Sequence, residues 1–114
     1  MANTTGDLLQ GTLSILILKA LLGGAAHGFG VARWIETTTQ DVLSIEEGSL
    51  YPALRRLEDK GWVQSEWGTS ENNRRARFYT ITAAGRAQLR AEASVWMRYA
   101  TAVTRVLRTA PAVG

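Results

Sequence analysis

Cysteine is absent from this chain of 114 residues, and histidine occurs only once, as His27. Without cysteine there can be no disulfide, no thiolate metal ligand and no cysteine nucleophile. A zinc site or a Ser-His-Asp triad would have to be built around His27 alone. The sequence therefore predicts a protein that is not an enzyme and that carries neither a metal nor another cofactor.

The sequence also predicts no targeting segment, and it contains no long apolar run. The apolar stretch at residues 13–22 is interrupted by Ser14 and Lys19, and it is shorter than the roughly 20 residues that cross a bilayer. No positively charged segment precedes it, so it is not expected to be a signal peptide. With 46% hydrophobic and 20% charged residues, the composition is that of one globular domain. We expect a cytoplasmic protein without a membrane partner.

Positive charge is concentrated in the C-terminal part of the chain. Residues 1–73 contain 5 basic and 9 acidic side chains, whereas residues 74–114 contain 8 basic and 1 acidic side chain. All but two of the 13 basic residues are arginine, which binds phosphate bidentately and stacks on bases. This distribution favours nucleic acid as a partner, although a solvated helix face would give the same count.

Hydrophobic periodicity predicts a mainly α protein with one small β-hairpin. Apolar residues recur at helical spacing in four segments, and two segments rich in aromatic and β-branched residues alternate with a period of about two. The predicted elements are helices at residues 8–22 and 29–39, a third helix ending at residue 61, strands at 62–67 and 77–82, and a long helix capped by Thr82 that extends to about Leu107.

The third helix is the clearest of the four, although its start is open. Leucines recur at i, i+4 and i+7 from Leu50. Ser44 and Glu47 fit a capping box, in which each side chain satisfies a backbone donor of the other residue. A start at residues 48–49 would instead place Pro52 in the first turn, where its missing N–H costs nothing.

Three helices followed by a hairpin describe a winged helix-turn-helix, in which the third helix enters the major groove and the hairpin, or wing, touches the flanking backbone. With Leu54 pointing inward, the outward face of the third helix carries hydroxyl and guanidinium donors that suit base edges and phosphates. A solvated helix surface is the alternative interpretation. The outward residues are Ser49, Pro52, Arg55, Arg56 and Asp59, with Tyr51 on the flank.

The predicted wing has a basic end. Three cations and two amides are concentrated where a wing meets phosphate, and the alternative is a solubilising loop. These residues are Asn72, Asn73, Arg74, Arg75 and Arg77.

Four other residues are expected to be structural. We interpret Trp34, Trp62 and Trp67 as core or hairpin packing, because no basic groove surrounds them in the sequence. His27 is expected to bond to the backbone of a turn.

The sequence resembles the PadR family of bacterial transcriptional regulators over essentially residues 8–108. The most specific match is residues 48–58 (GSLYPALRRLE), supported by residues 11–13 (GTL), 27–30 (HGFG), 75–79 (RARFY) and 82–85 (TAAG). The resemblance implies a homodimeric winged-helix regulator, usually a repressor, with relatives that respond to aromatic small molecules. It implies DNA contacts at Ser49, Tyr51, Pro52, Arg55 and Arg56 in the third helix, and at Asn73, Arg74, Arg75 and Arg77 in the wing.

The long final helix predicts a dimer. Its apolar stripe is too long for a domain of this size to cover, so we expect it to pair with the final and first helices of a second copy in a symmetric assembly. Packing of the stripe only within one subunit is the alternative. The expected interface residues are Leu9, Leu13, Leu89, Ala93, Trp96, Tyr99, Ala100, Val103 and Leu107.

The sequence as a whole predicts a winged helix-turn-helix DNA-binding domain at residues 1–82 and a dimerisation helix at residues 83–114. We expect a sequence-specific repressor that binds a double-stranded DNA operator as a homodimer. A planar aromatic effector could bind beside Trp96 and Met97, although a tryptophan on such a stripe is more often a packing residue. The alternative function is a winged-helix protein-interaction module without affinity for DNA.

Overall fold

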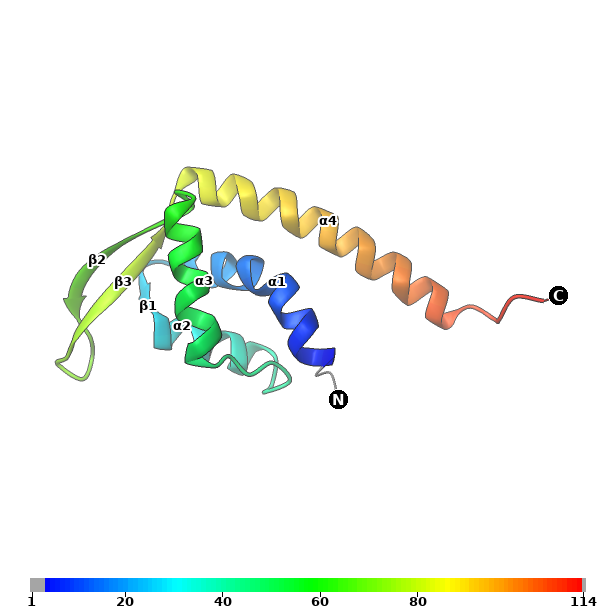
Figure 1. The fold of residues 1–114 in the computed structure, drawn as a ribbon, viewed down its shortest axis with the longest axis horizontal. Helices are drawn as coiled ribbons and strands as arrows, with labels where there is room; N and C mark the ends of the chain where they lie inside the picture. The colour runs from blue at the N-terminus through cyan, green and yellow to red at the C-terminus, as the bar shows by residue number, and fades with distance from the viewer. Residues whose placement is uncertain (1–3, 114) are drawn as a thin grey trace.

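The computed structural model describes residues 4–113 and contains four helices and a small sheet (Figure 1). Three helices precede the two long strands, and the fourth helix completes the chain. The elements are α1 (Thr4–Leu21), β1 (Ala26–His27), α2 (Gly28–Thr38), α3 (Glu47–Asp59), β2 (Val63–Thr69), β3 (Arg75–Ile81) and α4 (Ala83–Arg108). The predicted fold class, mainly α with a hairpin and a long last helix, is confirmed.

The core lies where α1, α2 and α3 meet the base of the sheet. Leu13 and Ile17 of α1, Ile35 of α2, and Leu54 and Leu57 of α3 are all at most 1% exposed. Burying a side chain of this size contributes roughly 1.5–3 kcal/mol, so this set holds the three helices in one arrangement. The core therefore fixes the position of α3 relative to the hairpin.

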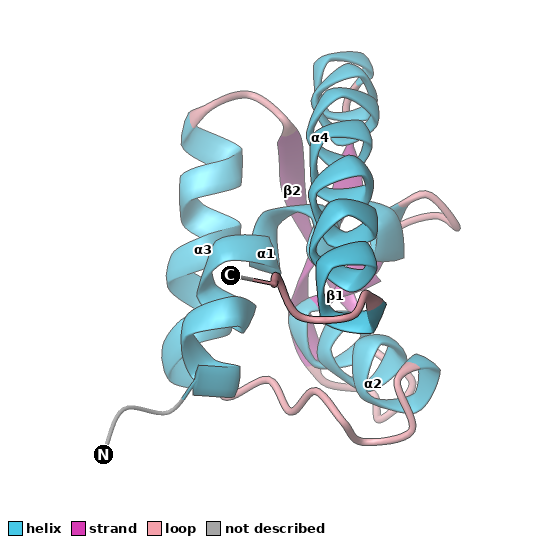
Figure 2. Ribbon diagram, turned by 90° about the vertical axis from the view of Figure 1, so that its right-hand side faces the viewer, coloured by secondary structure: helices cyan, strands magenta, loops and turns pink. Residues whose placement is uncertain are grey.

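The sheet has the strand order β1-β3-β2 and is antiparallel throughout. β2 and β3 form the wing. Seen from the C-terminal end of α4, the sheet lies beyond the helices (Figure 2). The strands are longer toward the turn than predicted, because Gly68 pairs with Ala76 and Thr69 pairs with Arg75. β1 was not predicted, since two residues are too few to show a period.

The start of α3 differs from both predicted alternatives. The N-cap is Glu46, which makes no side-chain capping bond, so the capping box at Ser44 is wrong. Ile45 is buried at 8% exposure, and its N–H donates to Glu36 Oε2 at 3.0 Å. These two contacts hold residues 44–45 in the segment before the helix. Pro52 is consequently the sixth helical residue rather than a first-turn residue.

The predicted cap of α4 is confirmed. Thr82 Oγ1 accepts from Gly85 N at 3.0 Å and donates to the carbonyl oxygen of Gly61 at 2.7 Å. From this end α4 crosses α1, buries Leu89 and then leaves the body of the protein (Figure 1). The molecule is therefore elongated, with extents of 64 × 31 × 22 Å. Within residues 4–113, no helix is both long and apolar enough to cross a membrane.

Candidate nucleic-acid interface

The outward face of α3 is polar, and its opposite face lies in the core. Leu50, Ala53, Leu54 and Leu57 are buried, as the leucine spacing predicts. The predicted outward residues lie on the exposed side, except that Ser49 is half-buried and its hydroxyl accepts a long hydrogen bond from Gln10 Nε2 at 3.4 Å. The exposed members are Pro52, Arg55, Arg56 and Asp59.

The tip of the wing, residues 70–74, is a tight five-residue loop. Ser70 N donates to the carbonyl oxygen of Arg74 at 2.8 Å, and Asn73 N donates to that of Ser70 at 2.9 Å. Asn73 has φ 58°, a left-handed conformation that asparagine tolerates better than most residues. Arg74, the last residue of this loop, and Arg75, the first residue of β3, are both exposed. Among residues 8–113 neither forms an ion pair. Their charges are therefore available to an anionic partner.

A cleft of about 470 Å³ separates α3 from the wing. Its walls are Tyr51, Pro52, Arg55 and Glu58 from α3, and Arg77 and Tyr79 from β3. Burial raises the pKa of the Tyr79 hydroxyl above its ordinary value of 10.0, an effect that the nearby Arg77 partly offsets. The hydroxyl thus stays protonated at neutral pH and remains a possible hydrogen-bond donor in the cleft.

Tyr51 reaches this cleft because α2 begins with a glycine. A Cβ at Gly28 would lie 2.7 Å from Tyr51 Cε1, well inside van der Waals contact. The preceding residue, His27, accepts a hydrogen bond from Gly30 N at Nδ1, 3.0 Å away, and so caps α2, which confirms its expected backbone bond. The HGFG stretch therefore both starts α2 and makes room for the Tyr51 ring.

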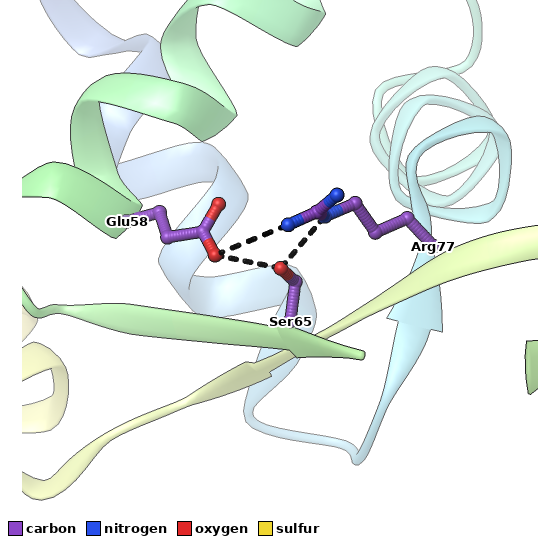
Figure 3. Close-up of polar contacts among 3 residues, drawn as sticks. All are labelled: Glu58, Ser65 and Arg77. Carbon is purple, nitrogen blue, oxygen red and sulfur yellow. Dashed lines mark hydrogen bonds and ion pairs between the residues drawn. The ribbon is translucent and has the colours of Figure 1, made fainter. Parts of the chain in front are cut away.

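Arg77 does not lie with the other predicted wing cations at the tip. Its Nε donates to Ser65 Oγ at 2.8 Å, and its Nη2 lies 3.8 Å from Glu58 Oε2 (Figure 3). Ser65 Oγ in turn donates to Glu58 Oε2 at 2.6 Å. The expectation of three cations concentrated at the tip is therefore corrected to two, because Arg77 lies within β3, opposite Trp67, and pairs with Glu58 of α3.

Trp67 was interpreted as core or hairpin packing because no basic groove surrounds it in the sequence, and the structure overturns that premise. The register pairs Trp67 with Arg77, and the Arg75 and Arg77 guanidinium carbons lie 4.6 and 5.5 Å from the Trp67 ring centroid. Trp67 is 55% exposed. The alternation of residues within each strand places Trp67, Arg75 and Arg77 on one face of the wing, but only once the strand register is known.

A second hollow of about 890 Å³ lies between the start of α2 and the wing. Phe29 and Arg33, which were not predicted to belong to any site, line this hollow together with Trp67 and Arg75. Phe29 is 61% exposed, with the Arg33 guanidinium 5.8 Å from its ring centroid. The cationic and aromatic surface is therefore wider than α3 and the tip alone.

The expected dimer residues fall into two groups. Leu13 and Leu89 are buried inside the subunit at 1% and 8% exposure, so they offer nothing to a second copy, and the expectation is corrected for both. Large apolar side chains farther along α4 are exposed: Trp96, Tyr99, Val103 and Leu107. Leu9, Ala93 and Ala100 are half-buried.

Trp96 and Met97 do not line a common hollow. Trp96 lies in a groove of about 430 Å³ between α1 and α4, lined also by Ile15, Val95 and Tyr99. Met97 faces a different depression farther along α4. Adjacent residues on a helix point about 100° apart, so within one subunit these two side chains face different hollows, and an effector site that combines them across two copies stays a prediction.

The fold is a helix-turn-helix followed by a wing, and the polar face of α3 and the exposed arginines of the wing lie on one side of it. These features define a winged-helix DNA-binding protein. The sequence profile of the transcriptional regulator PadR-like family matches residues 17–91, which is more than half of the chain. The chain belongs to this family, whose members are DNA-binding transcriptional regulators and not enzymes.

Two solved structures of transcriptional regulators agree with this assignment. A transcriptional regulator from Clostridium thermocellum is 27% identical, with a TM-score of 0.78 over 87% of this chain and 96% of its own. A PadR family regulator from Eggerthella lenta is 30% identical, with a TM-score of 0.74 over 91% and 88%. An uncharacterized protein from Lysinibacillus sphaericus is 28% identical over 90 residues, which are 79% of this chain and 83% of that protein.

Proposed function

We propose that this protein is a homodimeric, sequence-specific repressor that binds an operator through α3 and the wing. The observation that carries the proposal is the arrangement of the cleft: the polar face of α3, Tyr51 and strand β3 of the wing border one space. Arg74 and Arg75, which form no ion pair among residues 8–113, line the neighbouring hollow toward the tip. Arginines at the tip suit phosphate, and Tyr51 and Arg55 suit the edges of bases in a groove.

An electrophoretic mobility shift with DNA from upstream of the protein's own gene, repeated across salt concentrations, tests DNA binding. Several phosphate contacts produce a steep fall of affinity with salt. A random duplex of equal length is the control, and a sequence-specific regulator must prefer the upstream fragment. No binding to either duplex at low salt would instead favour the protein-interaction module, the second candidate function. The basic tip argues against that candidate.

Repression is tested separately, with a reporter gene placed behind the bound upstream fragment. Expression of the wild-type protein should lower reporter output, because a dimer seated on a promoter region excludes polymerase. Tyr51→Ala should restore output, since the Tyr51 side chain lies in the cleft. Higher output with the wild-type protein would identify an activator.

The apolar stripe on α4 supports the homodimer. Tyr99 is 68% and Leu107 is 78% exposed, and monomeric proteins rarely leave such an extended stripe uncovered. Sedimentation should give twice the 12.5 kDa chain mass for the wild type and the chain mass itself for a Val103→Asp, Leu107→Asp variant. Arg105→Ala serves as a control on the same segment. A wild-type monomer at all concentrations would contradict the dimer.

The groove beside Trp96 supports a planar aromatic effector, which would act by favouring one of two dimer geometries. In one geometry the paired α3 helices match successive major grooves, and in the other their spacing does not fit. An effector can shift this balance only by its difference in affinity for the two states. Trp96 fluorescence, with Trp34, Trp62 and Trp67 replaced by Phe, reports binding. An inducing aromatic that leaves the fluorescence unchanged would argue against this site.

A further inference from the structure

Glu58 is an acidic side chain on a surface that we assign to DNA. It lines the cleft between α3 and the wing, where a phosphate or base edge would approach. A carboxylate in such a place weakens the attraction of a polyanion, so its presence calls for a reason in the structure itself.

The reason lies in the contacts of Arg77. Its guanidinium meets three side chains from two other elements: Glu58 of α3 at 3.8 Å, and Ser65 and Trp67 of β2, at 2.8 Å and at 5.5 Å from the ring centroid. Glu58 and Arg77 form the single ion pair found among the side chains of residues 8–113. Figure 3 shows Glu58 reaching from α3 toward both wing strands.

The core joins α3 to the start of β2 and the end of β3, and these contacts add a second connection farther along the wing. The wing is anchored at its base by Val63 and Ile81, at 2% and 4% exposure, but Trp67 is 55% exposed and the strands continue beyond it to the tip. Beyond Phe78, where the pairing of β1 with β3 ends, the wing is two-stranded, and a two-stranded hairpin by itself is only marginally stable. The contacts between Glu58, Ser65 and Arg77 therefore lie where they can fix the angle between α3 and the wing.

We propose that Glu58 is a positioning residue that holds the wing at its DNA-binding angle through Ser65 and Arg77, and that Arg77 is part of this tether rather than a phosphate contact. The inference rests on the proposed function and deepens it. Preorganisation of this kind lowers the cost of ordering the interface on binding.

The sign of one substitution separates this proposal from simple electrostatics. Glu58→Ala removes a negative charge from the cleft, and charge alone would strengthen DNA binding. Loss of the tether predicts weaker binding, by about fivefold per subunit, the scale of one partly exposed ion pair. Asp59→Ala is the matched control, because it removes the same charge from the next position of α3, where the exposed Asp59 forms no ion pair among residues 8–113.

The salt dependence tests Arg77. A phosphate contact contributes about 0.9 to the slope of log K against log salt. Arg77→Ala should weaken binding and leave the slope unchanged, whereas Arg75→Ala should lower the slope by about 0.9 per subunit. Equal or tighter binding by Glu58→Ala, as by Asp59→Ala, would overturn the proposal, and so would a slope that falls with Arg77→Ala.

A DNA-free measurement keeps the inference separate from the proposed function. The chain has no cysteine, so Arg56→Cys and Asn72→Cys together allow spin labels on α3 and on the tip. Diluted into unlabelled protein, this pair should give a narrow distance distribution that broadens when Glu58→Ala is added. An unchanged distribution would refute the tether even if the protein binds DNA. A wild-type protein that binds no DNA would refute the proposed function, together with the inferred effect of Glu58 on binding.

Discussion

Removal of the two tip arginines should change the salt dependence of DNA binding by an amount that the structure sets. Arg74 and Arg75 are exposed and unpaired within residues 8–113, so each is available to neutralise one phosphate. Two contacts per wing and two wings per dimer give about four phosphates, and hence a contribution of about 3.6 to the slope of log K against log salt. Between 50 and 200 mM salt this corresponds to roughly a 150-fold change in affinity.

The assay is fluorescence anisotropy with a labelled operator at five or more salt concentrations, comparing the wild type with Arg74→Ala, Arg75→Ala. The variant should bind every duplex more weakly and should lack this part of the salt dependence. A change near 1.8 would indicate that only one wing touches DNA. Arg105→Ala, Arg108→Ala is the control, because it removes the same charge from the last turn of α4, far from the wing (Figure 1). An unchanged slope in the tip variant would refute the assignment of the wing to phosphate.

Three further predictions concern packing and protonation. Gly28→Ala should weaken operator binding, because the new Cβ displaces the Tyr51 ring. The ring can swing away, so the thermal midpoint of unfolding should fall by no more than a few degrees. Unchanged operator binding would contradict this prediction. Gly85→Ala should destabilise the fold by about 3 kcal/mol in urea unfolding, because its Cβ would meet the backbone carbonyl oxygen of Trp62, which cannot rotate away; a loss under 1 kcal/mol would contradict this. Burial raises the pKa of Tyr79, so the protonated hydroxyl should stabilise the fold below pH 10, and the free energy of unfolding should fall as the pH rises above that value. Tyr79→Phe should remove the share of this fall that comes from Tyr79.

Much of the fold could be predicted because the dominant signals are local. The leucine spacing in α3 identifies its buried face, and the Thr82 hydroxyl identifies the start of α4. The start of α3 could not be predicted in the same way. Ile45 is held by a bond to Glu36, nine residues earlier in the chain, so a tertiary contact outweighs the local capping preference of Ser44.

The candidate site could be predicted as a set of residues but not as an arrangement. The sequence placed Arg77 with Arg74 and Arg75 because the three are close in the chain. In the structure, Arg77 faces Glu58, 19 residues away, and this pairing depends on the angle between α3 and the wing. The environment of Trp67 depends in the same way on strand register, which no pattern within a single strand determines.

The length of α4 gives the proposed dimer a mechanical advantage. Its 26 residues span about 39 Å, and its last turns, after Tyr99, extend beyond the groove that it forms with α1 (Figure 1). If two such helices cross near Trp96, about 20 Å from the start of α4, a rotation of about 10° displaces that end by about 3.4 Å, which is one base-pair step along the duplex. A ligand seated near that crossing therefore needs to shift only a few atoms slightly to move the two α3 helices out of phase with successive grooves.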